Sequence, residues 1–277
     1  MKLGVTVSAY AAKFGPIVFR DPDIVKSIET IKKLGYDGVD LYMNRRSDEE
    51  IETLRCKFEE NKLEVASYVP IFLSEGGLNL SCRDSEKREK YIQELEEQIG
   101  KAQRIGTKRI PIGFSRGAKA EDENIFDNLA RLASTLDELC AFAEVKDITL
   151  CLEPINRYEI NTLNTVEQSL EFIEKYHLDK LGLLLDLFHM NIEDTSIEGA
   201  ILQAGNKIAH VHAPDSNRLA AGSGHLNYEN ILKALDATGY SGYLVLEAFP
   251  MPDAISCASM NASFIRQKLA ELEVSPI

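Results

Sequence analysis

The chain alternates between short apolar runs and longer segments whose apolar residues recur at helical spacing. Runs such as 181–185 are almost continuously apolar, which is typical of strands buried on both faces of a parallel sheet. Each run precedes a helical segment, and this order is the signature of parallel strand–helix units. The pattern predicts eight strands, at residues 3–8, 38–42, 64–69, 109–114, 148–153, 181–186, 208–212 and 243–247.

The helical segments carry start and stop signals that support the alternation. Capping or early acidic residues precede three of them, at 21–23, 47–50 and 164–167. Glycine follows three of the predicted helices, at Gly35, Gly106 and Gly239, where a left-handed C-terminal cap is expected. The predicted helices cover residues 23–34, 48–61, 85–105, 124–145, 165–176, 196–204, 228–237 and 254–272.

Eight units in 277 residues leave about 35 residues per unit, which is within the length that a strand–helix repeat needs. No stretch rich in Pro, Gly or Ser and no charge block interrupts the series. We therefore expect one α/β domain over residues 1–277, a single (β/α)8 TIM barrel. A doubly wound open sheet is the alternative, because the alternation of strands and helices alone does not show whether the sheet closes into a barrel.

Composition and charge narrow the functional classes. Lys and Arg number 31 against 44 Asp and Glu, a net charge of −13, which disfavours nucleic-acid or anionic-membrane partners. The N-terminus lacks the features of a signal peptide, and no run approaches the length of a membrane span. The five cysteines are scattered without a Cys-x-x-Cys pair, so we expect reduced thiols and a cytoplasmic protein.

Four consecutive predicted strands end on a potential metal ligand. These residues are Glu153, Asp186, His212 and Glu247, separated by 33, 26 and 35 residues. Each interval is close to one strand–helix repeat, and the carboxyl ends of barrel strands carry the active site. The spacing therefore predicts that three carboxylates and one imidazole converge.

A divalent cation would compensate this cluster, since unpaired buried carboxylates repel each other and cost several kcal/mol to desolvate. Oxygen-rich ligands with one imidazole suit Mn²⁺ or Co²⁺, with Mg²⁺ also possible, better than a structural zinc site. His210 shares a strand face with His212 and could be a further ligand, but its deeper position favours a hydrogen-bonded core histidine.

The loops after these strands carry polar side chains suited to a sugar, at 156–159, 189–191 and 215–218. No phosphate-binding glycine motif is present, so no nucleotide cofactor is expected. Arg116 and Lys119 follow the fourth predicted strand and allow two interpretations, a site for a substrate phosphate or a solvated loop, of which the solvated loop is favoured.

These residues resemble a known family. Segments 153–159, 161–165, 186–193 and 215–218 are similar to ketose 3-epimerases of the D-tagatose/D-psicose type, which belong to the xylose-isomerase-like TIM-barrel superfamily. The similarity spans all eight units and is densest from Glu153 to Glu247. The segment 8–11 does not match a particular substrate pocket, and the chain has no Trp, which related epimerases often place over the sugar.

The resemblance implies a role for each matching residue. Glu153, Asp186, His212 and Glu247 would bind the metal, and Glu153 and Glu247 would also exchange protons with substrate. Substrate oxygens around the first three carbons would be contacted by Glu159, His189 and Arg218. The partner is expected to be a small-molecule sugar, and the assembly a homodimer or homotetramer.

The expected reaction fits the residue types. Moving a proton beside a ketose carbonyl needs a base and stabilisation of the enediolate oxygens, which a metal chelating O2 and O3 would supply. Epimerisation at C3 also needs a second acid/base group on the opposite face, and Glu153 and Glu247 can flank the substrate. Alternatives are an aldose–ketose isomerase, a sugar-phosphate isomerase or epimerase, a keto-polyol dehydratase, an abasic-site endonuclease and a non-catalytic sugar-binding barrel.

Overall fold

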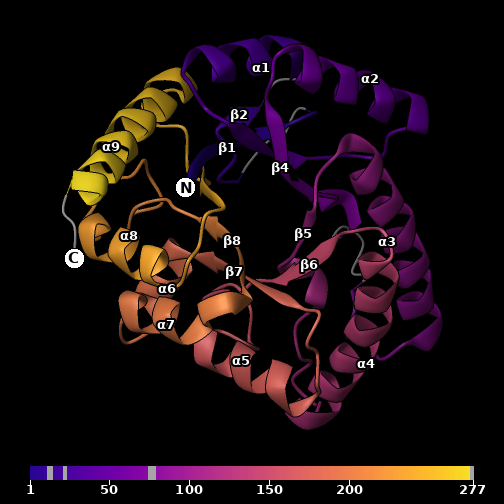
Figure 1. The fold of residues 1–277 in the computed structure, drawn as a ribbon. Coiled ribbons are helices and arrows are strands. Elements are labelled where there is room, and N and C mark those ends of the chain that lie inside the picture. Colours follow the sequence, from indigo (N-terminus) through magenta and orange to yellow (C-terminus); the bar gives the residue numbers. More distant parts are fainter. Residues whose placement is uncertain (11–14, 21–23, 74–78, 275–277) are drawn as a thin grey trace.

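Eight parallel strands form a nearly closed barrel with helices between them (Figure 1). The computed structural model describes residues 1–10, 15–20, 24–73 and 79–274. The barrel strands are β1 (Lys2–Ser8), β3 (Gly38–Tyr42), β4 (Glu64–Val69), β5 (Arg109–Ile112), β6 (Thr149–Leu152), β7 (Gly182–Asp186), β8 (Ile208–His212) and β9 (Tyr243–Leu246). A ninth short strand, β2 (Phe19–Arg20), pairs with the end of β1.

The pairing of the first and last strands closes the barrel. β1 lies between β3 and β9, with Leu3 opposite Leu244 and Val5 opposite Val39. Hydrogen-bonded pairing then continues through β8, β7 and β6 to β5, and is interrupted between β4 and β5, which lie side by side. The predicted (β/α)8 barrel is confirmed, and the open doubly wound alternative is wrong, because a doubly wound sheet keeps its first and last strands apart, whereas here β1 pairs with β9 and β4 lies beside β5.

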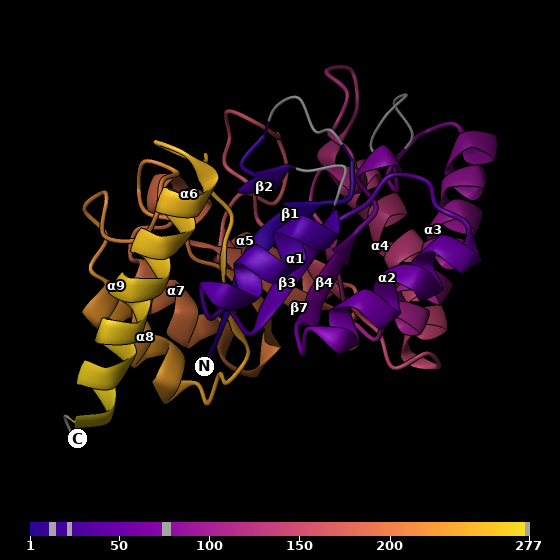
Figure 2. The same cartoon turned by 90° about the horizontal axis from the view of Figure 1, so that it is seen from above.

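Helices surround the barrel (Figure 1), and the view from above shows α9 and α3 on opposite sides of the strands (Figure 2). The bounds of the helices are α1 (Ile24–Lys33), α2 (Asp48–Glu60), α3 (Ser85–Ile105), α4 (Ile125–Glu144), α5 (Val166–Lys175), α6 (Leu187–Glu193), α7 (Ile197–Ala204), α8 (Tyr228–Ala237) and α9 (Ala254–Val274). Single-turn 3₁₀ helices occur at η2 (Phe114–Arg116) and η3 (Gly205–Lys207). Among the described residues, no helix is both long enough and apolar enough to cross a membrane.

The capping signals act as the sequence predicts. Ser47 and Glu50 form a capping box at the start of α2, and Thr165 accepts a hydrogen bond from the Gln168 amide at the start of α5. Gly106 ends α3 with a φ of +88°, a conformation that glycine adopts without steric cost. The proposed cap at 21–23 lies outside the described residues.

Three short elements differ from the prediction. The strand expected at 109–114 ends at Ile112, because the backbone turns at Gly113 into η2. Helix α6 was expected to be a loop, since its seven residues are too few to show a helical period. Strand β2 has only two residues and gives no alternating pattern.

Candidate active site

The ends of β6, β7, β8 and β9 bring the four predicted ligands together. One donor atom from each of Glu153, Asp186, His212 and Glu247 lies within 4.8 Å of the others, and all four side chains are buried. His212 Nδ1 is 3.3 Å from Asp186 Oδ2, 3.3 Å from Glu247 Oε2 and 3.8 Å from Glu153 Oε1. The repeat spacing in the sequence therefore corresponds to real convergence at one end of the barrel.

The donor set fits a divalent cation. His212 Nδ1 is buried and has no hydrogen-bond partner of normal geometry, whereas Nε2 of the same ring lies 3.0 Å from Asp40 Oδ2. The free nitrogen therefore faces three carboxylates, and three oxygens with one imidazole nitrogen suit Mn²⁺, Co²⁺ or Mg²⁺. These four residues could hold the metal that the sequence predicts.

The two glutamates experience different electrostatic environments. Burial, together with the negative charges of Glu247 and Asp186, raises the pKa of Glu153 to about 8. Burial acts in the same direction on Glu247, but the positive charges of His212 and Arg218 outweigh it and lower the Glu247 pKa. Such a divergence of two carboxyl pKa values is typical of an acid and base pair.

Gly113 allows Glu153 to be enclosed. A Cβ atom at this position would lie 2.5 Å from Glu153 Oε2, so a larger residue would displace the carboxyl group. Gly113 belongs to the turn that ends β5, and this turn forms part of the pocket wall. Close approach of backbone to a functional group is a common reason for glycine at such a site.

Arg218 is fixed between two of the predicted ligands. Its Nη1 atom donates to both oxygens of Asp186, at 2.8 and 2.7 Å, and its Nη2 atom donates to Glu247. The guanidinium also lies 4.9 Å from the ring centre of Phe188, and the residue has a φ of +60°. This left-handed backbone is uncommon outside glycine and is often found at functional sites.

His189 and Glu159 line the same pocket and share a hydrogen-bonding partner. The amide of Asn156 donates to Glu159 Oε1 and contacts His189 Nδ1, both at 2.7 Å. His189 Nδ1 therefore accepts from Asn156, and its Nε2 carries the proton, 4.0 Å from Glu153 Oε1. Burial lowers the His189 pKa and favours the neutral ring.

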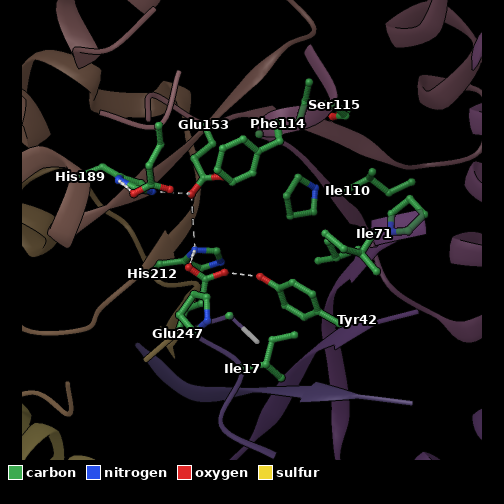
Figure 3. Close-up of a pocket in the computed structure, with 18 of the residues that line it drawn as sticks. Ile17, Tyr42, Ile71, Ile110, Phe114, Ser115, Glu153, His189, His212 and Glu247 are labelled. Atoms are coloured by element: carbon green, nitrogen blue, oxygen red, sulfur yellow. Dashed lines mark hydrogen bonds and ion pairs between the residues drawn. The ribbon is translucent and has the colours of Figure 1, made fainter. Parts of the chain in front are cut away.

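The pocket has one polar and one apolar wall (Figure 3). Glu153, His212 and Glu247, together with Glu159, His189 and Arg218, form the polar side, and the sequence analysis predicted all six as site residues. It missed Tyr42, which donates a hydrogen bond to Glu247 Oε1 from the end of β3. The facing wall is formed by apolar side chains that include Ile17, Ile71, Ile110 and Phe114.

Arg116 does not belong to a solvated loop and does not face a substrate phosphate. Its side chain is fully buried and donates to the backbone carbonyls of Glu153, Thr162 and Leu163. The Nζ atom of Lys119 donates to carbonyl oxygens of its own loop, at 2.8 and 3.2 Å. Both interpretations offered for Arg116 are wrong, because the guanidinium joins the segment after β5 to the loop after β6.

We expect Arg116→Ala to destabilise the protein without changing any preference between free and phosphorylated sugars. The substitution leaves buried carbonyls without donors, and charge-assisted hydrogen bonds are each worth about 1.5–3 kcal/mol, so a loss of about 3 kcal/mol is expected. Urea unfolding measures this change, with Lys119→Ala as the control that stays within about 0.5 kcal/mol. An Arg116→Ala variant of unchanged stability that had lost only its activity on sugar phosphates would contradict this role.

The comparisons with known proteins agree with the fold and the site. Residues 28–267 match the family model described as "Xylose isomerase-like TIM barrel". A probable ketose 3-epimerase of Synechocystis sp. is 31% identical over 80% of this chain and 77% of its own length. D-psicose 3-epimerase of Agrobacterium fabrum is 29% identical over 90% of this chain and 85% of that protein.

Solved structures show the same relationship. A structure of L-ribulose 3-epimerase superposes with a TM-score of 0.86 at 25% identity, covering 99% of this chain and 98% of that one. The protein is thus an α/β-barrel with an acidic metal-type site at its strand ends. It belongs to the xylose isomerase-like TIM-barrel family, and the family resemblance seen in the sequence is confirmed.

Proposed function

We propose that this protein is a divalent-metal-dependent sugar epimerase that inverts C3 of a ketose. The observation that carries the proposal is the placement of two buried glutamates with divergent pKa values around one pocket. Glu153 follows β6 and Glu247 follows β9, so two strands of the barrel separate them. Relatives named as ketose, D-psicose and L-ribulose 3-epimerases support the same reaction.

We propose that the metal is held by Glu153, Asp186, His212 and Glu247. When bound, an ion such as Mn²⁺ or Co²⁺, or Mg²⁺, supplies positive charge that stabilises negative charge on neighbouring sugar oxygens. Asp186 has a low proton affinity, because Arg218 and the nearby imidazoles outweigh its burial and lower its pKa. It would therefore remain anionic throughout the working pH range. No residue pattern calls for a nucleotide cofactor.

The two glutamates perform the proton transfers. In the metal-free site, Glu247 accepts hydrogen bonds from Tyr42 and Arg218 and its pKa is lowered, whereas the raised pKa of Glu153 favours its protonated form. One carboxylate removes the C3 proton from one face of the sugar, and the other carboxyl group donates a proton to the opposite face. The two residues exchange roles in the reverse epimerisation. At the end of the forward reaction the carboxylate that removed a proton is protonated, and the carboxyl group that donated one is ionised.

The remaining polar residues hold the sugar. We propose that Glu159, His189 and Arg218 contact oxygens around the first three carbons, because all three line the pocket beside Glu153 and Glu247. Asn156 sets the orientation of two of them, so that Nε2–H of His189 is available as a donor. Fixed orientation of this kind reduces the entropic cost of reaching a reactive geometry.

We expect Arg218→Ala to lower kcat/KM by about 100-fold while metal stoichiometry stays at one ion per chain. The guanidinium orients the sugar and stabilises developing negative charge, and it supplies no donor atom to a cation. Steady-state kinetics and elemental analysis measure the two quantities. Arg157→Ala is the matched control, since this exposed arginine pairs with Glu193 outside the pocket. Loss of the metal together with activity would instead make Arg218 a structural support of the site.

A panel of sugars tests the proposed reaction. Free and phosphorylated ketoses are incubated with the Mn²⁺- or Co²⁺-loaded protein, and the products are identified by NMR. A C3-epimeric ketose as the main product supports the proposal. An aldose indicates an aldose–ketose isomerase, turnover of phosphorylated sugars alone indicates a sugar-phosphate enzyme, and loss of water indicates a dehydratase.

We also propose a single domain that acts on a small sugar in the cytoplasm, as a homodimer or homotetramer, without nucleic-acid or membrane partners. Pairing of β1 with β9 supports the single domain, and the five free cysteines support a reducing compartment. The net charge of −13 supports the absence of polyanionic partners. Sedimentation velocity of the purified protein determines the oligomeric state.

A further inference from the structure

A buried carboxylate beneath the metal-type site has no part in the proton transfers described above. Asp40 lies in the middle of β3, and its side chain is fully buried inside the barrel. Barrel interiors are filled mainly by apolar side chains, and a buried carboxylate is costly unless it is hydrogen-bonded. The partners of Asp40 therefore indicate why it is there.

Asp40 accepts hydrogen bonds from both histidines of β8. Its oxygens lie 2.8 and 3.0 Å from His210 Nε2, and Oδ2 also lies 3.0 Å from His212 Nε2. The sheet order places β1 and β9 between β3 and β8, so these bonds cross the barrel interior. Because an ionised carboxylate only accepts hydrogen bonds, both imidazoles must carry a proton on Nε2.

This arrangement determines which nitrogen of His212 faces the site. With Nε2 donating to Asp40, the lone pair of a neutral ring is on Nδ1, the atom directed toward Asp186 and Glu247. Metal-binding histidines commonly donate their second ring N–H to a carboxylate, which fixes the ring and raises its basicity. His210 anchors Asp40 from the other side and stacks edge to face with His212.

We propose that Asp40 is a positioning residue that, held by His210, prepares Nδ1 of His212 to bind the metal. The inference rests on the proposed function, because it assumes that His212 is a ligand. Asp40, His210 and His212 could themselves be considered a cation site. Asp40 Oδ2 lies 2.8 Å from His210 Nε2 and 3.0 Å from His212 Nε2, which is hydrogen-bond spacing, so the trio is assigned as a hydrogen-bonded support.

The main test measures how tightly the metal-free protein binds Mn²⁺ and Co²⁺. Asp40→Asn keeps the shape of the side chain but replaces the anion with a neutral amide, which has only one accepting oxygen. We expect the dissociation constants for Mn²⁺ and Co²⁺, measured in competition with a chelator, to be 10- to 100-fold larger than those of the unmodified protein. Saturating Mn²⁺ should restore turnover, because the substitution removes no proton-transfer group.

Ser67→Ala is the matched control. Ser67 is opposite Asp40 on the neighbouring strand β4, is fully buried, and has an Oγ atom without a hydrogen-bond partner. Its substitution removes a polar atom at the same depth without touching His212, so metal affinity should stay within a factor of two. Thermal unfolding of both variants confirms that the comparison is made on folded protein.

A measurement on the unmodified protein keeps the test decisive if Asp40→Asn does not fold. NMR of ¹⁵N-histidine in the Mg²⁺-loaded protein should show His212 protonated on Nε2 and without a proton on Nδ1. A proton on Nδ1, or unchanged metal affinity in folded Asp40→Asn, would overturn the role of Asp40 and leave the proposed function intact. Failure of the unmodified protein to bind a divalent cation would overturn both.

Discussion

Glu153→Gln and Glu247→Gln are each expected to reduce kcat by about 10³-fold or more at saturating metal. Glutamine matches the shape of glutamate but can neither accept nor return the C3 proton. Because inversion requires transfer on both faces, loss of either group stops the full reaction. The remaining oxygen of each amide is still a neutral metal ligand, so kinetics are measured over a range of metal concentrations.

The two variants should differ in the partial reaction they retain. A variant with one intact carboxylate can still exchange the C3 hydrogen of one epimer with solvent, and the epimer identifies the face served by that carboxylate. Glu64→Gln is the control, because Glu64 begins β4 at the other end of the barrel and pairs with Lys2. Retention of more than about a tenth of native turnover in either variant would remove that glutamate from the proton transfers.

Removal of divalent cations is expected to abolish turnover, and Mn²⁺ or Co²⁺ should restore it. The reason is electrostatic, since three buried carboxylates surround His212 and the substrate oxygens need compensating charge. Activity of chelator-treated protein is followed as each ion is added back, with Ca²⁺ and K⁺ as controls. Full turnover of metal-free protein would contradict the metal dependence.

Metal affinity should also rise with pH between pH 6 and pH 8. The raised pKa of Glu153, about 8, means that this carboxyl group carries a proton at neutral pH, which an incoming cation must displace. Burial would lower the His212 pKa, but the surrounding carboxylates raise it well above its usual value, so a second proton is displaced. Apparent affinity should therefore increase about tenfold or more per pH unit from pH 6 to 7.

The raised pKa of Glu153 also affects the stability of the metal-free protein. Because the folded-state pKa of Glu153 exceeds the ordinary value of 4.5, the folded chain holds this proton longer than the unfolded chain does. The stabilising contribution of Glu153 is complete below pH 4.5 and is lost as pH rises toward 8. Glu153→Gln should remove this part of the pH dependence, as measured by chemical unfolding between pH 5 and 8.

Sequence periodicity was sufficient to predict the barrel and the convergence of Glu153, Asp186, His212 and Glu247. Apolar runs define the strands, and side chains at strand ends converge whenever the strands are parallel neighbours in a barrel. The bounds 38–42, 64–69 and 208–212 agree with the structure to the residue. The proton-exchange and substrate-contact roles came from family resemblance and remain predictions.

Residues whose partners come from distant strands could not be predicted in this way. Asp40 is one polar residue within an apolar run, and its bond to His210 crosses 170 positions of sequence and the barrel interior. Tyr42 at a strand end looks like an ordinary aromatic core residue until its hydroxyl meets Glu247. Arg116 was interpreted as a loop cation, because local polarity does not reveal that three carbonyl groups enclose it.

The central claim is inversion at C3 by two-sided proton exchange, and hydrogen labelling tests it most directly. The metal-loaded protein is incubated in heavy water with the ketose that it converts fastest, and the product is analysed by NMR. The account predicts one deuterium at C3 of the epimeric ketose, because Glu153 and Glu247 exchange with solvent before they donate. Absence of deuterium from C3 during verified turnover, or an aldose as the main product, would contradict it.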